Sequence, residues 1–173
     1  MGAGAGQFRP DYAFEHVTGI TPRFLAEQNI HAVILDLDNT LTRWEQGELA
    51  PGVQEWVRAL QEARFRLVIL SNGLRAKQRK VAEELEVPVV VARLPKPCAA
   101  GFRRALKTLG VPAQRAAMIG DIVFTDIWGA NRLGILSILV EPLSSCDFPG
   151  TKLWRLLERL FRLRRPCREA SRQ

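Results

Sequence analysis

Five short runs of mostly apolar, often β-branched residues recur along this chain, and segments of helical periodicity separate them. Near-continuous apolar runs are typical of parallel strands that are buried on both faces. Strands that alternate with helices form parallel sheets with right-handed crossovers. The pattern therefore predicts an α/β fold with an open, five-stranded parallel sheet. The expected strands are residues 31–36, 66–70, 87–92, 116–119 and 135–140.

Helices are expected between these strands, where apolar residues return at helical spacing. One or two further short helices are expected within residues 11–30, where Gly19 and Pro22 interrupt the apolar pattern. The expected connecting helices cover residues 51–63, 74–85, 99–109 and 124–133.

The charge of the chain is unevenly distributed. Its 173 residues, of which 47% are apolar, suffice for one compact domain. Residues 151–173 carry eight basic and two acidic residues, whereas the remainder carries seventeen basic and sixteen acidic. We therefore expect a disordered N-terminus over residues 1–10, an α/β domain over 11–150, and a basic C-terminal segment over 151–173.

Within the C-terminal segment, residues 153–163 place leucines and aromatics on one half of a helical wheel and arginines on the other. Such a helix either packs its apolar half on the domain or lies at an anionic membrane surface. The pattern leaves both alternatives open.

Cysteine usage and hydropathy indicate the compartment. Cys98, Cys146 and Cys167 lack the spacing of a metal site or a disulfide framework, which favours reduced thiols. No apolar run approaches the roughly 20 residues that span a bilayer, and no signal-peptide core is visible. The sequence predicts a cytoplasmic protein. Peripheral contact at the inner membrane surface through residues 151–168 stays open as the alternative to packing of this segment on the domain.

Polar residues follow four of the predicted strands, at the point where each strand ends. Because ligands bind beyond the carboxyl ends of parallel strands, these residues are expected to converge on one site. The candidates are Asp36, Asp38 and Thr40 after the first strand, Ser71 and Asn72 after the second, Lys96 after the third, and Asp121 and Asp126 after the fourth.

This set of side chains suits phosphoryl transfer with a metal ion. The neighbouring carboxylates of Asp36 and Asp38 repel each other unless a cation or a proton intervenes. Asp121 adds a third oxygen donor, and carboxylates are ligands that Mg²⁺ prefers. An aspartate can attack phosphorus, and a lysine such as Lys96 can offset the charge that gathers there. Thr40 and Ser71 can hold phosphate oxygens.

Each of these residues also has an ordinary structural interpretation. Asp, Asn and Ser favour turns and helix caps, and Asp126 could cap the helix expected at 124–133. Their joint occurrence at four strand ends favours a functional site. Arg43 and Arg93, near this site in sequence, could contact substrate. His16 and His31 lack partners at useful spacing and are expected to be structural.

Four segments of this chain resemble the four motifs of haloacid dehalogenase-like (HAD) phosphatases in order and spacing. They are DLDNTLT at 36–42, SNG at 71–73, KP at 96–97 and GDIVFTD at 120–126. Residues 120–143 resemble more narrowly the YqeG family of subclass IIIA. The resemblance implies a HAD-like Rossmannoid three-layer sandwich, with the five strands in the order 5-4-1-2-3.

The resemblance also implies catalytic roles. Asp36 would be the nucleophile and a metal ligand, and Asp38 the general acid and base, with its backbone carbonyl on the metal. Asp121 would ligate Mg²⁺, and Asp126 would support the metal site without contacting the ion. Phosphoryl binding would fall to the remaining motif residues, with Ser71 and the Asn72 backbone on its oxygens and Lys96 stabilising both phosphoryl group and nucleophile.

The intervals between motifs bear on substrate choice. Too few residues lie between 41 and 51, or between 72 and 96, to form a folded cap domain. An uncapped site admits a large substrate, and the resemblance extends to phosphatases of phosphatidylglycerophosphate. Two alternatives remain open, a soluble sugar phosphate or nucleotide as substrate and a catalytically silent interaction module. Nucleic-acid binding is not favoured, because no recognition motif accompanies the basic segment.

Overall fold

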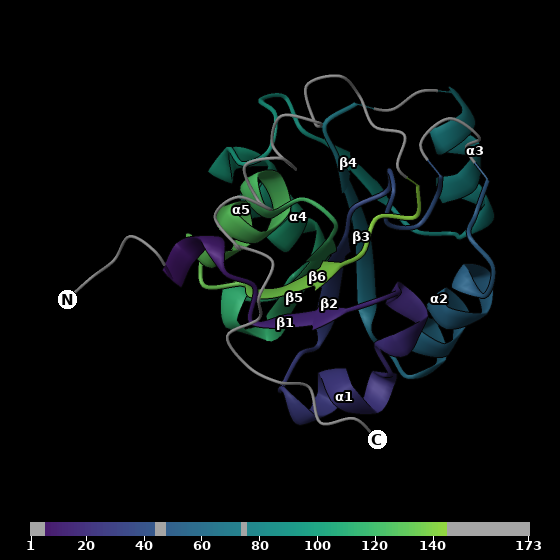
Figure 1. The fold of residues 1–173 in the computed structure, drawn as a ribbon, viewed down its shortest axis with the longest axis horizontal. Helices are drawn as coiled ribbons and strands as arrows, with labels where there is room; N and C mark the ends of the chain where they lie inside the picture. The colour runs from purple at the N-terminus through teal and green to yellow at the C-terminus, as the bar shows by residue number, and fades with distance from the viewer. Residues whose placement is uncertain (1–5, 44–47, 74–75, 145–173) are drawn as a thin grey trace.

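In the computed structural model, six parallel strands form one sheet in the order β1-β6-β5-β2-β3-β4 (Figure 1). The structure describes residues 6–43, 48–73 and 76–144. Every neighbouring pair of strands is parallel. The strands are β1 (Tyr12–Phe14), β2 (Ala32–Leu35), β3 (Arg66–Ser71), β4 (Val89–Val91), β5 (Ala116–Gly120) and β6 (Leu136–Val140).

The order of the five predicted strands, 5-4-1-2-3, is confirmed, but the prediction of a five-stranded sheet was wrong. The sixth strand is β1, which pairs with β6 at the sheet edge. The three residues of β1 are too few to show an alternating pattern. The register of β1 is instead fixed by Asp11, whose carboxylate accepts a hydrogen bond from the Ser137 backbone N–H at 2.9 Å. Sequence periodicity could not reveal that contact.

Helices cover both faces of the sheet, as a three-layer sandwich requires. Alternate residues of β2 show the division, because Val33 and Leu35 pack on one side while Ala32 and Ile34 pack on the other. The first side is covered by α1 (Pro22–Glu27), α2 (Val53–Glu62) and α3 (Ala76–Glu84), and the second by α4 (Ala99–Leu109) and α5 (Trp128–Asn131) (Figure 1).

Most predicted helices are present within a few residues of their expected bounds. The α4 helix has the expected bounds and ends at Gly110, whose φ of 64° suits a residue without a side chain. The single helix expected over 124–133 is different, because a π-helix at Val123–Ile127 precedes the short α5. This π-turn carries one of the predicted site residues, Asp126.

Several predictions concern the ends and gaps of the described ranges. The structure describes residues 6–10 of the N-terminus that was expected to be disordered, and Asn131 Nδ2 donates to the carbonyls of Gln7 and Arg9 at 2.8 and 2.9 Å. Residues 1–5 and the predicted C-terminal segment lie outside the described residues. Within the described ranges, no folded cap interrupts the domain. No helix of those ranges is long and apolar enough to cross a membrane.

Candidate active site

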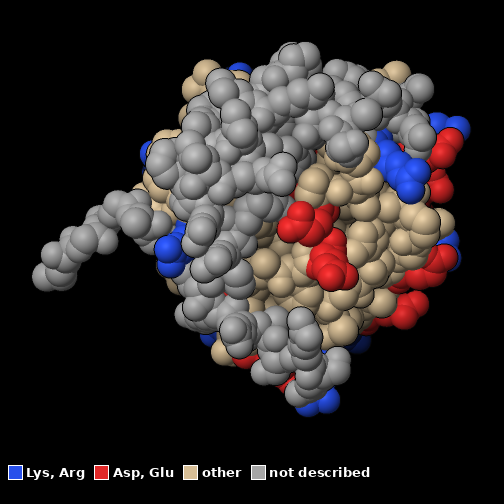
Figure 2. Space-filling model, in the orientation of Figure 1, with Lys and Arg blue, Asp and Glu red and all other residues tan. Residues whose placement is uncertain are grey.

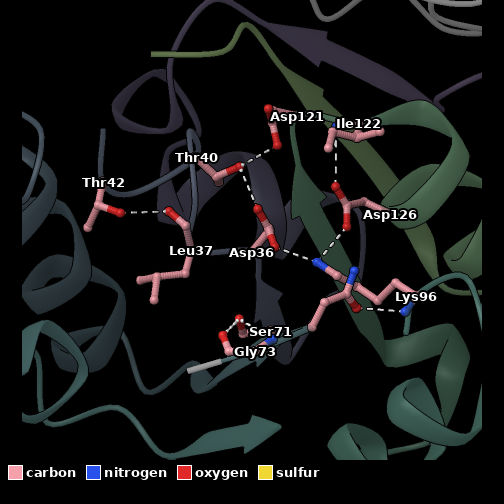
Figure 3. Close-up of polar contacts among 11 residues, drawn as sticks. Asp36, Leu37, Thr40, Thr42, Ser71, Gly73, Lys96, Asp121, Ile122 and Asp126 are labelled. Carbon is pink, nitrogen blue, oxygen red and sulfur yellow. Dashed lines mark hydrogen bonds and ion pairs between the residues drawn. The ribbon is translucent and has the colours of Figure 1, made fainter. Parts of the chain in front are cut away.

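The carboxyl edge of the sheet brings the predicted residues together from four strands (Figure 3). Asp36 follows β2, Ser71 ends β3, Lys96 lies between β4 and α4, and Asp121 follows β5. Asp36 and Asp121 flank the point where the strand order reverses, which is where ligands bind in open α/β sheets. The site residues that are buried in the structure are Asp36, Thr40, Ser71, Lys96, Asp121 and Asp126.

The Lys96 side chain lies between two carboxylates at the centre of the site. Its Nζ donates a hydrogen bond to Oδ1 of Asp36 and lies 2.7 Å from Oδ1 of Asp126. The other oxygen of Asp36 lies 3.4 Å from the Thr40 hydroxyl, which is equally far from Oδ1 of Asp121. Figure 3 shows these contacts as one continuous chain from Asp121 to Asp126.

Asp126 is held in this position by the backbone around it. Its second oxygen, Oδ2, accepts a hydrogen bond from the Ile122 N–H at 3.2 Å. A Cβ at Gly120 would lie 2.5 Å from the same oxygen, so the carboxylate fits only because residue 120 has no side chain. Asp126 lies in the π-turn at Val123–Ile127, and such turns occur frequently at functional sites.

The loop that carries Lys96 is fixed by Asn72. The Asn72 side-chain Oδ1 accepts a hydrogen bond from the Lys96 backbone N–H at 2.6 Å. Sequence reasoning assigned only the Asn72 backbone to the site and missed this side-chain contact. The Ser71 hydroxyl contacts the Gly73 backbone in the same turn, where the Gly73 N–H lies 3.3 Å from Oγ.

The loop after β2 is closed by its own backbone and by the end of the described chain. Asn39 adopts a left-handed conformation with φ of 58°, and its N–H donates to the Thr42 carbonyl at 2.7 Å. On the other side, Asn39 accepts hydrogen bonds from the Leu143 N–H at 3.0 Å and the Ser144 hydroxyl at 3.1 Å. Asp38, half-buried, lies in this loop and pairs with Thr42 through the backbone.

The electrostatics of the site favour a bound cation. Burial raises the pKa of Asp36 well above its ordinary value; Lys96 opposes this effect, and Asp126 and Asp121 add to it. Burial alone would lower the pKa of Lys96, but the carboxylates of Asp126 and Asp36 more than compensate and raise it. The lysine therefore stays charged, and three buried carboxylates face a single ammonium group.

This acidic triad fits a divalent metal ion. Ligand oxygens of Asp36, Asp121 and Asp126 all lie within 4.8 Å of one another. Mg²⁺ and similar hard cations bind carboxylate oxygens that lie this near to one another. The triad contains two of the predicted metal ligands, Asp36 and Asp121. The third side chain of the triad is that of Asp126, which the sequence analysis predicted to support the metal site without contacting the ion. The third predicted ligand was instead the backbone carbonyl of Asp38.

Comparison with known proteins places the chain in a family. The sequence profile of the haloacid dehalogenase-like hydrolases matches residues 43–134. The chain belongs to this family. It is 34% identical to the probable phosphatase YqeG of Bacillus subtilis, over 88% of each chain.

One further relative bears on activity, and one solved structure bears on the fold. The chloroplastic phosphatidylglycerophosphate phosphatase 1 of Chlamydomonas reinhardtii is 30% identical over 88% of this chain, which spans 60% of that enzyme. A haloacid dehalogenase-like hydrolase from Xanthomonas campestris superposes with a TM-score of 0.54 at 15% identity, over 76% of this chain and 96% of the other, and supports the fold alone. Together with the family match, the relatives identify this HAD protein as a phosphatase.

Proposed function

We propose that this phosphatase hydrolyses phosphate monoesters with Mg²⁺ and an aspartyl-phosphate intermediate, with Asp36 as the nucleophile. The position of the Asp36 carboxylate carries the proposal. It is buried at the carboxyl edge of the sheet, with Lys96 on one oxygen and Thr40 near the other. A carboxylate held beside a cationic group can attack phosphorus, because the charge that develops there is offset.

The proposed reaction has two halves. In the first, an oxygen of Asp36 bonds to phosphorus while the bond from phosphorus to the ester oxygen breaks. Asp38 donates a proton to that oxygen, which leaves as an alcohol. In the second, Asp38 takes a proton from water as the water oxygen attacks phosphorus, and the bond to Asp36 breaks to release phosphate. Asp38 thus acts first as acid and then as base.

The remaining site residues bind and neutralise the phosphoryl group in this proposal. Lys96 stays protonated, because its pKa is raised, and offsets the charge of the transferring group. The hydroxyls of Thr40 and Ser71 and the Asn72 backbone N–H donate to phosphoryl oxygens.

Mg²⁺ would be held by Asp36, Asp121 and the backbone carbonyl of Asp38, with Asp126 supporting the site through Lys96 and Ile122. When bound, the ion would stabilise negative charge on the phosphoryl oxygens.

For the substrate, we propose the phosphate of phosphatidylglycerophosphate, with peripheral contact at an anionic membrane through residues 151–168. Two observations support this choice. A phosphatase named for this lipid is among the relatives, and the described residues contain no cap that would exclude a lipid surface. The eight basic residues of 151–173 would add attraction to anionic lipid. A soluble sugar phosphate or nucleotide is the alternative substrate.

Turnover of an aryl phosphate with Mg²⁺ tests the mechanism. Asp36→Asn is expected to abolish hydrolysis while the circular dichroism spectrum stays unchanged. Asp11→Asn is the matched control, because this carboxylate contacts Ser137 outside the site, and it should retain activity. Hydrolysis that persists in Asp36→Asn would overturn the nucleophile assignment.

A substrate panel tests the lipid proposal separately. Phosphatidylglycerophosphate in mixed micelles is compared with sugar phosphates and nucleotides at equal phosphate concentration. A preference for the micellar substrate is expected, and efficient turnover of soluble phosphates alone would favour the alternative. Deletion of residues 151–173 should weaken binding to anionic vesicles at a fixed salt concentration, because salt screens this attraction.

A further inference from the structure

The segment that leads into Lys96 is exposed over three residues and buried on either side of them. Arg93, Leu94 and Pro95 are exposed, while the flanking Ala92 and Lys96 are buried. Leu94 is 58% exposed, and with Val91 it is one of two exposed large hydrophobic residues among those the structure describes. We call residues 93–95 the lip of the site.

Hydrogen bonds fix the lip at both ends. The Ala92 N–H donates to the Ser71 carbonyl at 2.9 Å and so continues the pairing of β4 with β3. The Lys96 N–H donates to Asn72 Oδ1 at 2.6 Å. The Cys98 N–H then donates to the Pro95 carbonyl at 3.0 Å. These hydrogen bonds fix the backbone that presents Leu94 to solvent. A partner that binds Leu94 therefore does not have to order this segment, which lowers the entropic cost of binding.

The lip also lies beside the path that a substrate must take. Leu94 and Lys96 are two positions apart in the chain, with only Pro95 between them, so their Cα atoms are at most about 7 Å apart. The sheet beneath Asp36 is filled by buried side chains such as Leu35 and Ile119. The organic part of a phosphate monoester must consequently leave the site outward, past this edge. An exposed leucine and arginine there would meet whatever carries the phosphate.

We infer that the lip is a membrane contact, in which Leu94 enters the apolar region of an anionic lipid surface and Arg93 pairs with lipid phosphate. The inference rests on the proposed function, whose lipid substrate it makes more specific. An apolar side chain next to a basic one is the combination that binds at such an interface.

A relative named for phosphatidylglycerophosphate favours a lipid surface over a protein partner as the occupant of the lip. On the face seen in Figure 2, the described residues form no broad basic patch, and acidic side chains lie near its centre. The described residues of that face are therefore not expected to attract anionic lipid, and the inference rests on the lip alone.

Vesicle binding by the full chain tests the inference apart from catalysis. All variants carry Asp36→Asn, and the vesicles contain phosphatidylglycerol and phosphatidylcholine at about 0.15 M salt, where exposed charges are screened beyond about 8 Å. Leu94→Ser is expected to weaken binding about threefold to tenfold, because the buried apolar area is lost. Leu94→Met should bind like the parent protein, since it keeps that area.

A charge control accompanies these variants. Arg93→Gln should weaken binding to the anionic vesicles and leave binding to pure phosphatidylcholine unchanged. Lys107→Gln removes the same unit charge from an exposed position near the end of α4, at the opposite edge of the sheet. This control should leave binding at the parental level.

Activity of the otherwise unmodified enzyme completes the test. Leu94→Ser should lower turnover of a lipid phosphomonoester in vesicles by a similar factor, through KM, and leave aryl phosphate hydrolysis intact. Parental vesicle binding by Leu94→Ser, or an equal loss with both substrates, would overturn the inference. Sedimentation gives a further test. If the parent protein were a dimer and Leu94→Ser were a monomer, a second copy of the chain would be the occupant of the lip, and the inference would be overturned. Failure of the proposed mechanism would be recognised by a different result, namely aryl phosphate hydrolysis that persists in Asp36→Asn.

Discussion

Lys96 and Asp126 form an ion pair that is almost completely buried, with 2.7 Å between Nζ and Oδ1. The same ammonium group contacts Asp36, the proposed nucleophile. Asp126 is therefore connected to the centre of the site through the lysine. A buried lysine that loses one of two carboxylate partners keeps its desolvation cost and loses part of its compensation.

Asp126→Asn is expected to lower kcat for an aryl phosphate about 10- to 100-fold, a typical loss when a supporting partner of a metal or charged site is removed. The physical reason is that Lys96 becomes less firmly held and its pKa falls toward its ordinary value. The measurement is kcat as a function of pH, in which the variant should lose activity at high pH earlier than the parent. Asp11→Asn should leave the profile unchanged, and an unaltered profile in Asp126→Asn would contradict this role.

Gly120→Ala is expected to displace the Asp126 carboxylate, because the added Cβ would lie 2.5 Å from its Oδ2. Overpacking of this kind costs about 1 to 3 kcal/mol of unfolding free energy. We expect a lower melting temperature together with a loss of activity larger than the loss of folded protein explains. Gly19→Ala is the matched control, since its Cβ would meet Phe14 at an ordinary 3.5 Å. Full activity of Gly120→Ala would show that Asp126 can move without consequence.

Long apolar strands were predictable from sequence, because burial on both faces leaves a continuous apolar pattern. The runs at 66–70 and 116–119 became β3 and β5 almost unchanged. The short edge strand β1 was not predictable, since its register depends on a contact between Asp11 and Ser137 across 126 residues. The π-turn at Val123–Ile127 was likewise missed, because its sequence shows ordinary helical periodicity.

The convergence of the site could be predicted for the same reason as the sheet, since parallel strands end at one edge. What the sequence did not show was how the side chains are shared. Lys96 contacts both Asp36 and Asp126, and Asn72 supports the lysine through its side chain. Such contacts depend on loop geometry between residues far apart in the chain, for which no local pattern exists.

Metal binding should stabilise the protein in a pH-dependent way. The pKa of Asp36 is raised in the folded, metal-free protein above its ordinary value of 3.8. The folded state then binds this proton more tightly than the unfolded state, so the unfolding free energy falls as pH rises through the raised pKa. Mg²⁺ needs the ionised carboxylate. The increase in melting temperature on adding Mg²⁺ should therefore be small at low pH and grow as pH rises above the ordinary carboxyl range.

Asp121→Asn provides the check on this expectation. It removes one carboxylate of the triad and should reduce or abolish the Mg²⁺-induced rise in melting temperature at every pH. Thermal melts with and without MgCl₂, with a chelator as reference, measure the effect. A rise in melting temperature that is independent of pH, or that persists undiminished in Asp121→Asn, would place the ion elsewhere.

Asn72→Ala is expected to lower kcat about tenfold with little change in stability, because a single hydrogen bond contributes only about 1 kcal/mol to folding. The side chain accepts from the Lys96 N–H at 2.6 Å, and its loss frees the loop that aims the lysine at Asp36. The Asn72 backbone, proposed to bind the phosphoryl group, is unaltered by the substitution. A decrease in kcat with nearly constant KM is therefore the expected result in steady-state assays with an aryl phosphate. Asn72→Asp retains an acceptor oxygen and should recover part of the lost kcat. If alanine and aspartate variants were equally impaired, the hydrogen bond to Lys96 would not be the reason that asparagine is needed at this position.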